Sequence, residues 1–291
     1  MKKISDVVAE FLKEKKIKHV FGIVGAGNVH LFDWDEINFA ECAREMIVSG
    51  DYLQPQIDFM PFWEKPPLFI WLQVAAMKLV GINELAARLP NVLAGIATLA
   101  IVYTTGRKIH NKQHGMWWAT MFAICWLPHF YFRTGIIDPI FNLFIFLSFY
   151  QVHRIGEQED SGWKNALMAG TFLGLAALTK GPVGILVALL SFGVFLIWNK
   201  GWGRYRLWHL LIIAVFAALP FSLWIMATIW QHGYEYGSWF LKEFIEYQIR
   251  LFSTEDSDHG GPFFYHFVVL LAGCFPASVL LLQPLNSKEK Q

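Results

Sequence analysis

The sequence predicts an all-α polytopic membrane protein, and two observations support that prediction. Apolar residues make up 55% of the 291 residues and charged residues only 16%, whereas soluble domains average roughly 45–50% and 25%. The apolar residues also gather in runs near the ~20 residues that a helix needs to cross a bilayer. We expect about seven spans, at 88–109, 115–131, 137–153, 164–179, 182–198, 207–230 and 262–284.

A short soluble segment is predicted before these spans. Ile4, Val7 and Phe11 recur at helical spacing opposite a lysine-rich face, and the strand-like run HVFGIVG follows. The segment lacks the continuous apolar core of a signal peptide. Its two close glycines are not followed by the third glycine of a dinucleotide-binding loop, because His30 occupies that position.

Two amphipathic juxtamembrane helices are expected between this segment and the first span. Phe39, Ala43 and Met46 share one helical face, so residues 36–48 are predicted to lie on the membrane surface. The apolar stretch 67–82 is short for a span, which favours an interfacial helix.

Lysine and arginine in the short connections predict the orientation. They occupy eight of 31 positions in one set of alternate connections and four of 42 in the other. The first set, expected in the cytoplasm, comprises 106–114, 153–164 and 199–208; the second comprises 132–138, 179–182 and the long loop 231–261. We therefore expect a multi-pass protein of the cytoplasmic membrane whose acids and bases converge on the external, periplasmic face.

Charge and cysteine content argue against other functional classes. A net charge of +1 without a long block of like charge gives no basis for a nucleic-acid partner. Cys42, Cys125 and Cys274 have no metal-binding or redox spacing, and two of them fall within apolar runs. We expect those two to be small core residues, and membrane lipids to be partners of the chain.

Two charged pairs before the first span are candidate site residues. Asp35 and Glu36 start the helix predicted at 36–48, where capping that helix is the alternative interpretation. Glu64 and Lys65 precede two prolines in WEKPPLFIW, at the edge of an apolar run. Lys65 is placed to neutralise a lipid phosphate, or else it extends its charged end to the membrane surface.

Two further candidates lie at the ends of predicted spans. Asp138, in TGIIDP, begins a span just before a proline, and helix capping explains it equally well. Lys180, in LTKGPVG, lies in a tight external turn between two spans. A lipid headgroup explains this lysine as well as a substrate does.

An ordered set of motifs over residues 34 to about 284 resembles the polytopic lipid-linked-sugar glycosyltransferases. These are the protein O-mannosyltransferases and, more closely, the bacterial aminoarabinose transferase-like branch. The motifs are WDEINFAECAREM, WEKPPLFIWL, NELAARLP, TGIIDP, LTKGPVG and GPFFYHFVVLLAGCFP. The resemblance implies a GT-C type helical bundle. Its external cavity would pass a sugar from a polyprenyl-phosphate donor to a hydroxyl or phosphate of lipid A, another glycan or a protein.

The same resemblance implies roles for individual residues. Asp35 matches the catalytic aspartate of the first loop, Glu36 its neighbour, and Asp138 the second acid. Donor binding is implied for Glu64, Lys65 and Arg250. A carboxylate that accepts the acceptor's proton and cations that stabilise the departing phosphate suit this chemistry.

No organic cofactor is implied, and a divalent metal ion is a candidate. Glu64 and His259 offer ligands, although two residues without defined spacing favour no particular metal.

The chain departs from the family pattern in two places after residue 33. Asn38 occupies the position, two after the Asp-Glu pair, where the family carries arginine. The sequence given ends at Gln291, soon after the last predicted span. We expect the donor or acceptor contact of that arginine to be weakened, and part of the cavity wall or acceptor site to be absent.

Residues 1–33 resemble instead the N-terminus of thiamine-diphosphate-dependent, acetolactate-synthase-like enzymes. F-G-x-x-G-x-x-N carries this resemblance, with Val24 where those enzymes commonly have proline. We interpret the chain as a junction near Asp33 and Trp34 between two unrelated sequences. The predicted organisation is a soluble fragment at 1–33, an external catalytic loop at 34–87, a transmembrane region at 88–284 and a cytoplasmic tail at 285–291.

Three functional hypotheses follow. The first is an inverting membrane glycosyltransferase or its N-terminal portion, and the second is an inactive chimeric membrane remnant. The third and weakest is a thiamine-diphosphate-binding fragment. The lysine-rich N-terminal segment is expected to resist translocation. Either 67–82 spans the membrane and leaves Asp35 in the cytoplasm, away from Asp138, or the soluble segment is carried across.

Overall fold

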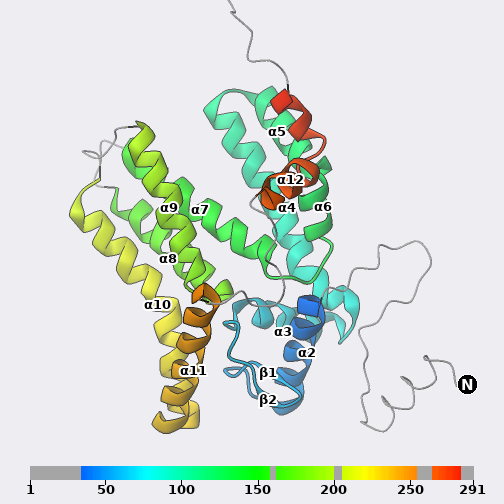
Figure 1. Ribbon diagram of the computed structural model, residues 1–291, viewed down its shortest axis with the longest axis vertical. Coiled ribbons are helices and arrows are strands. Elements are labelled where there is room, and N and C mark those ends of the chain that lie inside the picture. The colour runs from blue at the N-terminus through cyan, green and yellow to red at the C-terminus, as the bar shows by residue number, and fades with distance from the viewer. Residues whose placement is uncertain (1–33, 158–161, 200–204, 254–263, 283–291) are drawn as a thin grey trace, which may run out of the picture.

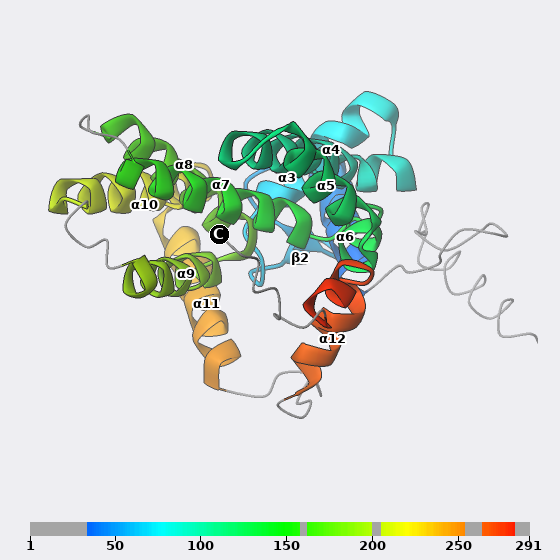
Figure 2. The ribbon, with the colours of Figure 1, turned by 90° about the horizontal axis from the view of Figure 1, so that it is seen from above.

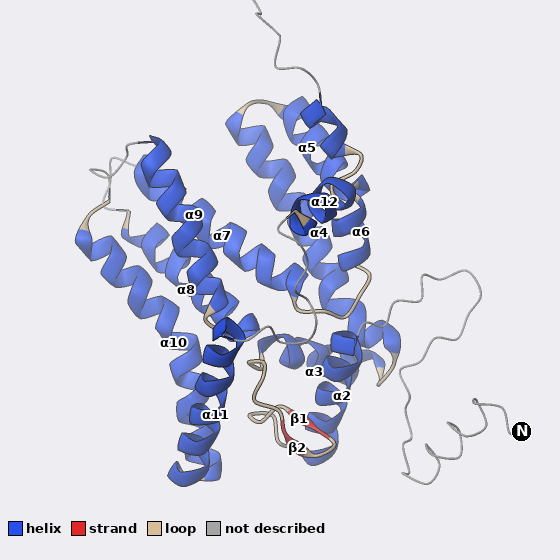
Figure 3. Ribbon diagram, in the orientation of Figure 1, coloured by secondary structure: helices blue, strands red, loops and turns tan. Residues whose placement is uncertain are grey.

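The computed structural model describes residues 34–157, 162–199, 205–253 and 264–282. These residues form a helical bundle with one small hairpin (Figures 1 and 3). The predicted soluble fragment, its thiamine-enzyme resemblance, the tail 285–291 and His259 lie outside the described residues.

The first described elements form a compact layer at one end of the bundle (Figure 1). This layer consists of α2 (Trp34–Ser49), β1 (Gln56–Ile57), β2 (Met60–Pro61) and α3 (Leu68–Val80). The two strands are antiparallel.

The bundle itself is built from long helices joined by short turns. Its elements are α4 (Glu84–Ile109), α5 (Lys112–Ile124), α6 (Trp126–Tyr131), α7 (Asp138–Glu157), α8 (Trp163–Lys180), α9 (Val183–Asn199) and α10 (Leu207–His232). They are followed by α11 (Tyr234–Ser253), α12 (Tyr265–Gly273) and a 3₁₀ turn at Ala277–Leu282.

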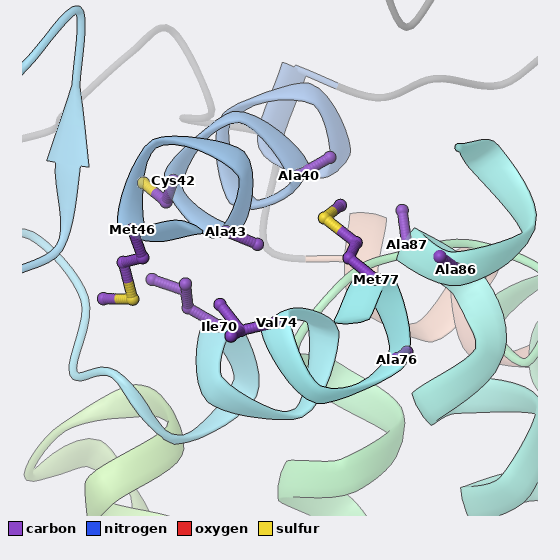
Figure 4. Packing of buried hydrophobic residues seen from close by; sticks show 10 residues of the cluster. All are labelled: Ala40, Cys42, Ala43, Met46, Ile70, Val74, Ala76, Met77, Ala86 and Ala87. Atoms are coloured by element: carbon purple, nitrogen blue, oxygen red, sulfur yellow. The ribbon is translucent and has the colours of Figure 1, made fainter. Parts of the chain in front are cut away.

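The helix predicted at 36–48 is confirmed as α2, but protein covers its apolar face. Ala43 and Met46 are fully buried, in a cluster with Ile70 and Val74 of α3 (Figure 4). Small alanines at the start of α4 complete this cluster, so α2 can pack closely there. The apolar face of α2 is therefore explained by packing against protein, and its position relative to the membrane surface stays a prediction.

Helix α3 supports the interfacial interpretation of 67–82. Its 13 residues extend about 20 Å at ~1.5 Å per residue, less than the ~30 Å hydrocarbon core. Phe69 and Gln73 on its inner face are completely buried. The Phe69 ring meets Phe39 of α2 edge to face, with ring centroids 5.7 Å apart.

The hairpin is tied to α2 by a buried acid. Asp58 and Phe59 form its turn with φ of 56° and 57°, and the Phe59 amide donates to Glu45 Oε2 at 2.7 Å. Burial raises the pKa of Glu45. It also raises the pKa of the neighbouring Cys42 thiol, which favours the neutral, unreactive form of this thiol.

The segment between α2 and the hairpin is held against α10 and α11. The indole of Trp224 donates to the Leu53 carbonyl at 2.8 Å, and His232 Nε2 lies 3.1 Å from Asp51 Oδ2. Burial, with a smaller contribution from the Asp51 charge, raises the pKa of Tyr236 to about 12. These contacts join the N-terminal layer to the other side of the bundle.

Three predicted elements differ from the structure. The span at 115–131 is two helices, because Cys125 is extended, with ψ of 138°. The span at 262–284 is likewise divided into α12 and a 3₁₀ turn, with Pro276 between them. The prediction of a long loop at 231–261 is wrong over most of that range, because helix α11 occupies Tyr234–Ser253.

The chain has the fold of a helical membrane protein. Within the described ranges, α4 and α10 are both long and apolar enough to cross a bilayer, and α3 and α9 are shorter apolar helices. The starts of α4, α7 and α9 and the ends of α8 and α10 lie beside the N-terminal layer (Figure 1). The sequence predicts that successive connections lie alternately at the two ends of the bundle, and the helices are arranged in that way.

Glycines allow α8 and α10 to pack in close contact. A Cβ atom on Gly174 would lie 2.7 Å from the Ala217 carbonyl oxygen and 2.8 Å from Pro220 Cδ. Gly170, one turn earlier, meets the Ile213 carbonyl in the same way. Small residues at such crossings are what bring membrane helices together.

We expect Gly174→Ala to lower the free energy of unfolding by about 2 kcal/mol, because the added methyl overpacks the crossing. Thermal unfolding of the purified chain in detergent measures the effect. Gly193→Ala in α9 is the matched control, since nothing lies within 4 Å of its Cβ position. Equal unfolding midpoints for the two variants would contradict this account of the packing.

Candidate functional site

Asp35 and Glu36 lie in opposite environments at the start of α2. Asp35 is exposed, whereas Glu36 is completely buried. Glu36 Oε1 accepts hydrogen bonds from Arg88 Nε at 2.8 Å and from the Gly135 amide at 2.6 Å. Glu36 therefore joins α2 to the start of α4 and to the turn before α7, which a capping role alone does not explain.

The turn before α7 is fixed from a second side. The Asn91 amide of α4 donates to the carbonyls of Thr134 and Ile136, both at 2.6 Å. Gly135 is needed between them, because a Cβ there would lie 3.1 Å from the Ala87 carbonyl and 3.2 Å from Glu36. These contacts set the direction in which α7 leaves the turn, and with it the position of Asp138.

Asp138 and Lys180, predicted from separate motifs, form an ion pair. Lys180 Nζ donates to Asp138 Oδ1 at 2.6 Å, and the two side chains are 32% and 29% exposed. Asp138 is the first residue of α7 and Lys180 the last of α8, so each charge also suits the dipole of its own helix. The carboxylate of Asp138 thus lies beside a cation.

A second cluster forms where the WEKPP segment meets α11. Tyr247 donates its hydroxyl to Glu64 Oε2 at 3.1 Å, and Gln248 donates to the Glu64 carbonyl at 3.3 Å. Lys65 Nζ lies 5.9 Å and Arg250 Cζ 5.6 Å from the centre of the Tyr247 ring. The two cations assigned to a phosphate by resemblance therefore flank one aromatic side chain.

The turn after Lys180 brings the two clusters together. Gly181 has φ of 85°, and a Cβ on it would lie 3.0 Å from Gln248 Oε1. Gln248 in turn bonds to the backbone of Glu64. The ion pair and the Glu64–Tyr247 cluster are therefore connected by direct contacts at the N-terminal-layer end of the bundle.

An apolar cavity of about 410 Å³ opens beside this connection. Gly181 and Gln248 line one part of it, next to Phe221 of α10 and Phe244 of α11. The rest of its wall is almost entirely aliphatic. A long hydrocarbon chain is the kind of ligand that such a wall accommodates, with its polar end toward the clustered charges.

In the structure, Glu64 serves as a hydrogen-bond acceptor. In the ranges that the structure covers, no three side chains of His, Cys, Asp or Glu gather to bind a metal. The other predicted ligand, His259, lies outside those ranges.

Sequence reasoning missed three residues of this site. Arg88 carries a charge in the second turn of an apolar helix, which is a signal that could have identified it. Tyr247 and Gln248 lie in a segment predicted as loop, so nothing placed them opposite Glu64. Glu36, Asp138, Lys180, Glu64, Lys65 and Arg250 take part in the contacts described above, and Asp35 is exposed beside Glu36 at the start of α2.

Comparisons with known proteins find a matching family model and similar transferases. A family model described as dolichyl-phosphate-mannose-protein mannosyltransferase matches residues 64–226. The undecaprenyl phosphate-alpha-4-amino-4-deoxy-L-arabinose arabinosyl transferase of Erwinia tasmaniensis is 27% identical over 84% of this chain and 44% of its own length. The transferase of the same name from Pseudomonas aeruginosa is 27% identical over 92% and 48%. The chain thus spans about half the length of these relatives.

The fold is also found among solved structures. The crystal structure of ArnT from Cupriavidus metallidurans bound to undecaprenyl phosphate superposes with a TM-score of 0.74 at 22% identity, over 87% of this chain and 46% of that one. Its apo state gives a TM-score of 0.71 at 20% identity, over 96% and 50%. The GT-C type helical fold expected from the sequence is confirmed.

We expect Glu36→Gln to lower the free energy of unfolding by about 2–3 kcal/mol, because the charged partner of the half-buried Arg88 is removed. Asp35→Asn, the same chemical change one residue earlier, is the control and should alter stability by less than about 0.5 kcal/mol. Thermal unfolding in detergent compares the two. Equal losses would show that Glu36 is no more structural than Asp35.

Proposed function

Because the chain belongs to the dolichyl-phosphate-mannose-protein mannosyltransferase family, we propose that it is a membrane glycosyltransferase that uses a polyprenyl-phosphate sugar donor. One observation carries the proposal: the Asp138–Lys180 ion pair and the Glu64–Tyr247 cluster, with Lys65 and Arg250 beside the Tyr247 ring, are connected through Gly181 and Gln248, which also line an apolar cavity. The names of the relatives make undecaprenyl phosphate-linked 4-amino-4-deoxy-L-arabinose the first donor to test. A lipid A phosphate is the first acceptor to test, before another glycan or a protein hydroxyl.

The proposed reaction is a single displacement at the anomeric carbon. The acceptor oxygen forms a bond to that carbon while the bond from carbon to the donor phosphate oxygen breaks, so that configuration is inverted. Asp35 takes the acceptor's proton, since it is the exposed acid of the first motif. The polyprenyl phosphate leaves with the bonding electron pair.

The cations of the second cluster suit the departing phosphate. Lys65 and Arg250 flank the Tyr247 ring, which limits their movement before the donor arrives. Fixed charges of this kind stabilise the charge that develops on a leaving group without costly reorganisation. The isoprenoid chain would occupy the cavity beside Gln248, close to both cations.

Asp138 and Lys180 would act as a unit in this scheme. Their ion pair keeps a carboxylate and an ammonium about equally accessible at the site. The carboxylate is available to hydrogen-bond sugar or acceptor hydroxyls, and the ammonium to contact phosphate. Glu36 would position Asp35 without contacting substrate, because it is completely buried.

The site is proposed to face the periplasm from the cytoplasmic membrane. The opposite end of the bundle carries Arg107, Lys108 and Lys112 at the α4–α5 turn, with Arg154 at the end of α7 and Lys164 at the start of α8. A concentration of basic residues in short connections is typical of the cytoplasmic side.

Asp35→Asn should reduce sugar transfer by about 10²–10⁴-fold, because it removes the proposed base. The assay supplies the undecaprenyl-linked donor and a lipid A acceptor to membranes that contain the full chain. Lys65→Gln should lower transfer by about a hundredfold through loss of phosphate stabilisation. Asp58→Asn at the exposed hairpin turn is the matched control and should transfer normally.

Unchanged transfer by Asp35→Asn would remove the proposed base from the mechanism. If the unmutated chain transfers no sugar with any polyprenyl-linked donor, the proposed enzymatic function fails and the inactive membrane remnant is the better description.

Single cysteines should report the orientation. In a chain with Cys42, Cys125 and Cys274 replaced by alanine, Asp58→Cys should react with a membrane-impermeant maleimide in intact spheroplasts. Gln113→Cys, equally exposed at the other end of the bundle, should react only after the membrane is opened. The reverse pattern would place the site in the cytoplasm.

A further inference from the structure

The turn between α4 and α5 is a concentrated basic surface, which we call the basic turn and define as residues 107–114. Its exposed ionisable side chains are Arg107, Lys108, His110, Lys112 and His114. No Asp or Glu occurs anywhere between residues 84 and 138. Within the described part of the chain, no ion pair joins these side chains to a carboxylate.

An apolar groove of about 640 Å³ begins at the basic turn. His110 and His114 form its polar edge, with ring centroids 4.6 Å apart. Trp117 and Met121, on successive turns of α5, continue the groove, and Leu280 of the 3₁₀ turn also lines it. The groove therefore combines hydrogen-bond donors at one end with apolar surface along the rest.

The position of the groove along α4 places it at a membrane boundary. α4 has 26 residues, about 39 Å at ~1.5 Å per residue, so it is long enough to cross the hydrocarbon core. The basic turn comprises the last residues of α4 and the first of α5, and Trp117 is 64% exposed just beyond it. Tryptophan is enriched at this depth, where lipid phosphates meet the ends of acyl chains. The proposed catalytic site lies at the opposite end of the bundle (Figure 1), and the view from above shows α5 beside α4 (Figure 2).

We propose that the basic turn and its groove bind one anionic phospholipid. The headgroup phosphate contacts Lys112 and the imidazoles of His110 and His114, and one acyl chain lies along Trp117 and Met121. The charges are complementary, since the turn offers several cations without a competing carboxylate and the lipid supplies the anion. A signal for membrane orientation alone requires the lysines and arginines but neither the imidazole pair nor the groove.

Native mass spectrometry of the full chain in a non-ionic detergent tests this proposal. The chain is titrated with phosphatidylglycerol and, in parallel, with zwitterionic phosphatidylcholine. We expect bound phosphatidylglycerol to exceed phosphatidylcholine. The double variant Lys112→Gln/His114→Gln should weaken phosphatidylglycerol binding at least about fivefold, the contribution of one lysine near an anionic headgroup.

A matched double variant separates the site from general charge. His153→Gln/Lys164→Gln removes one imidazole and one ammonium from the neighbouring helices α7 and α8, outside the groove lining. It should bind phosphatidylglycerol like the unmutated chain. An equal loss in the two double variants would overturn the proposal, because it would show dependence on charge alone.

A second variant tests the groove without a change of charge. Ala277→Phe fills the groove from its lining and should reduce phosphatidylglycerol binding while the basic turn stays intact. Inorganic phosphate in excess should not displace the lipid. Unchanged binding by Ala277→Phe, or displacement by phosphate, would show that a headgroup phosphate alone is recognised and would overturn the proposed lipid site.

Discussion

The structure depends first on the buried carboxylate of Glu36. A charge without solvent is tolerated only where it is paired and hydrogen-bonded, and Glu36 finds its partners 52 and 99 residues away along the chain. Arg88 of α4 and the amide of Gly135 must therefore stay in place whenever α2 is docked. Asp35 precedes this carboxylate and Asp138 follows Gly135 by three residues, so one buried interaction sets the relative position of both proposed catalytic acids.

Burial distinguishes the charged side chains that stabilise the fold from those that are accessible to a substrate. Glu36 and Glu45 are buried and hold the N-terminal layer together, whereas Asp35 and Arg250 are exposed and Lys65 is partly so. The sequence places Asp35 and Glu36 side by side with the same kind of side chain. Their difference in burial, and with it in proposed role, arises because α2 turns one acid into the protein and the other outward.

Local pattern accounted for most of the fold because apolar runs predict buried or lipid-facing helices directly. The starts and ends of α8, α9 and α10 were predicted within two residues. α11 was missed because its many charges resemble those of a loop, although Phe240, Phe244 and Tyr247 bury one face of a helix. The spans at 115–131 and 262–284 were over-extended because the extended backbone at Cys125 and the break around Pro276 divide them.

The sequence by itself determined that this is an apolar, multi-helix membrane protein, where most of its helices lie, and which motifs carry acids and bases. Only the tertiary structure decided how those groups pair: Lys180 with Asp138, Arg88 with Glu36, and Tyr247 with Glu64. These partners are 42, 52 and 183 residues apart. A hydrophobic period specifies one helix and its apolar face, but the contact between distant side chains depends on how whole helices pack, and no local pattern contains that information.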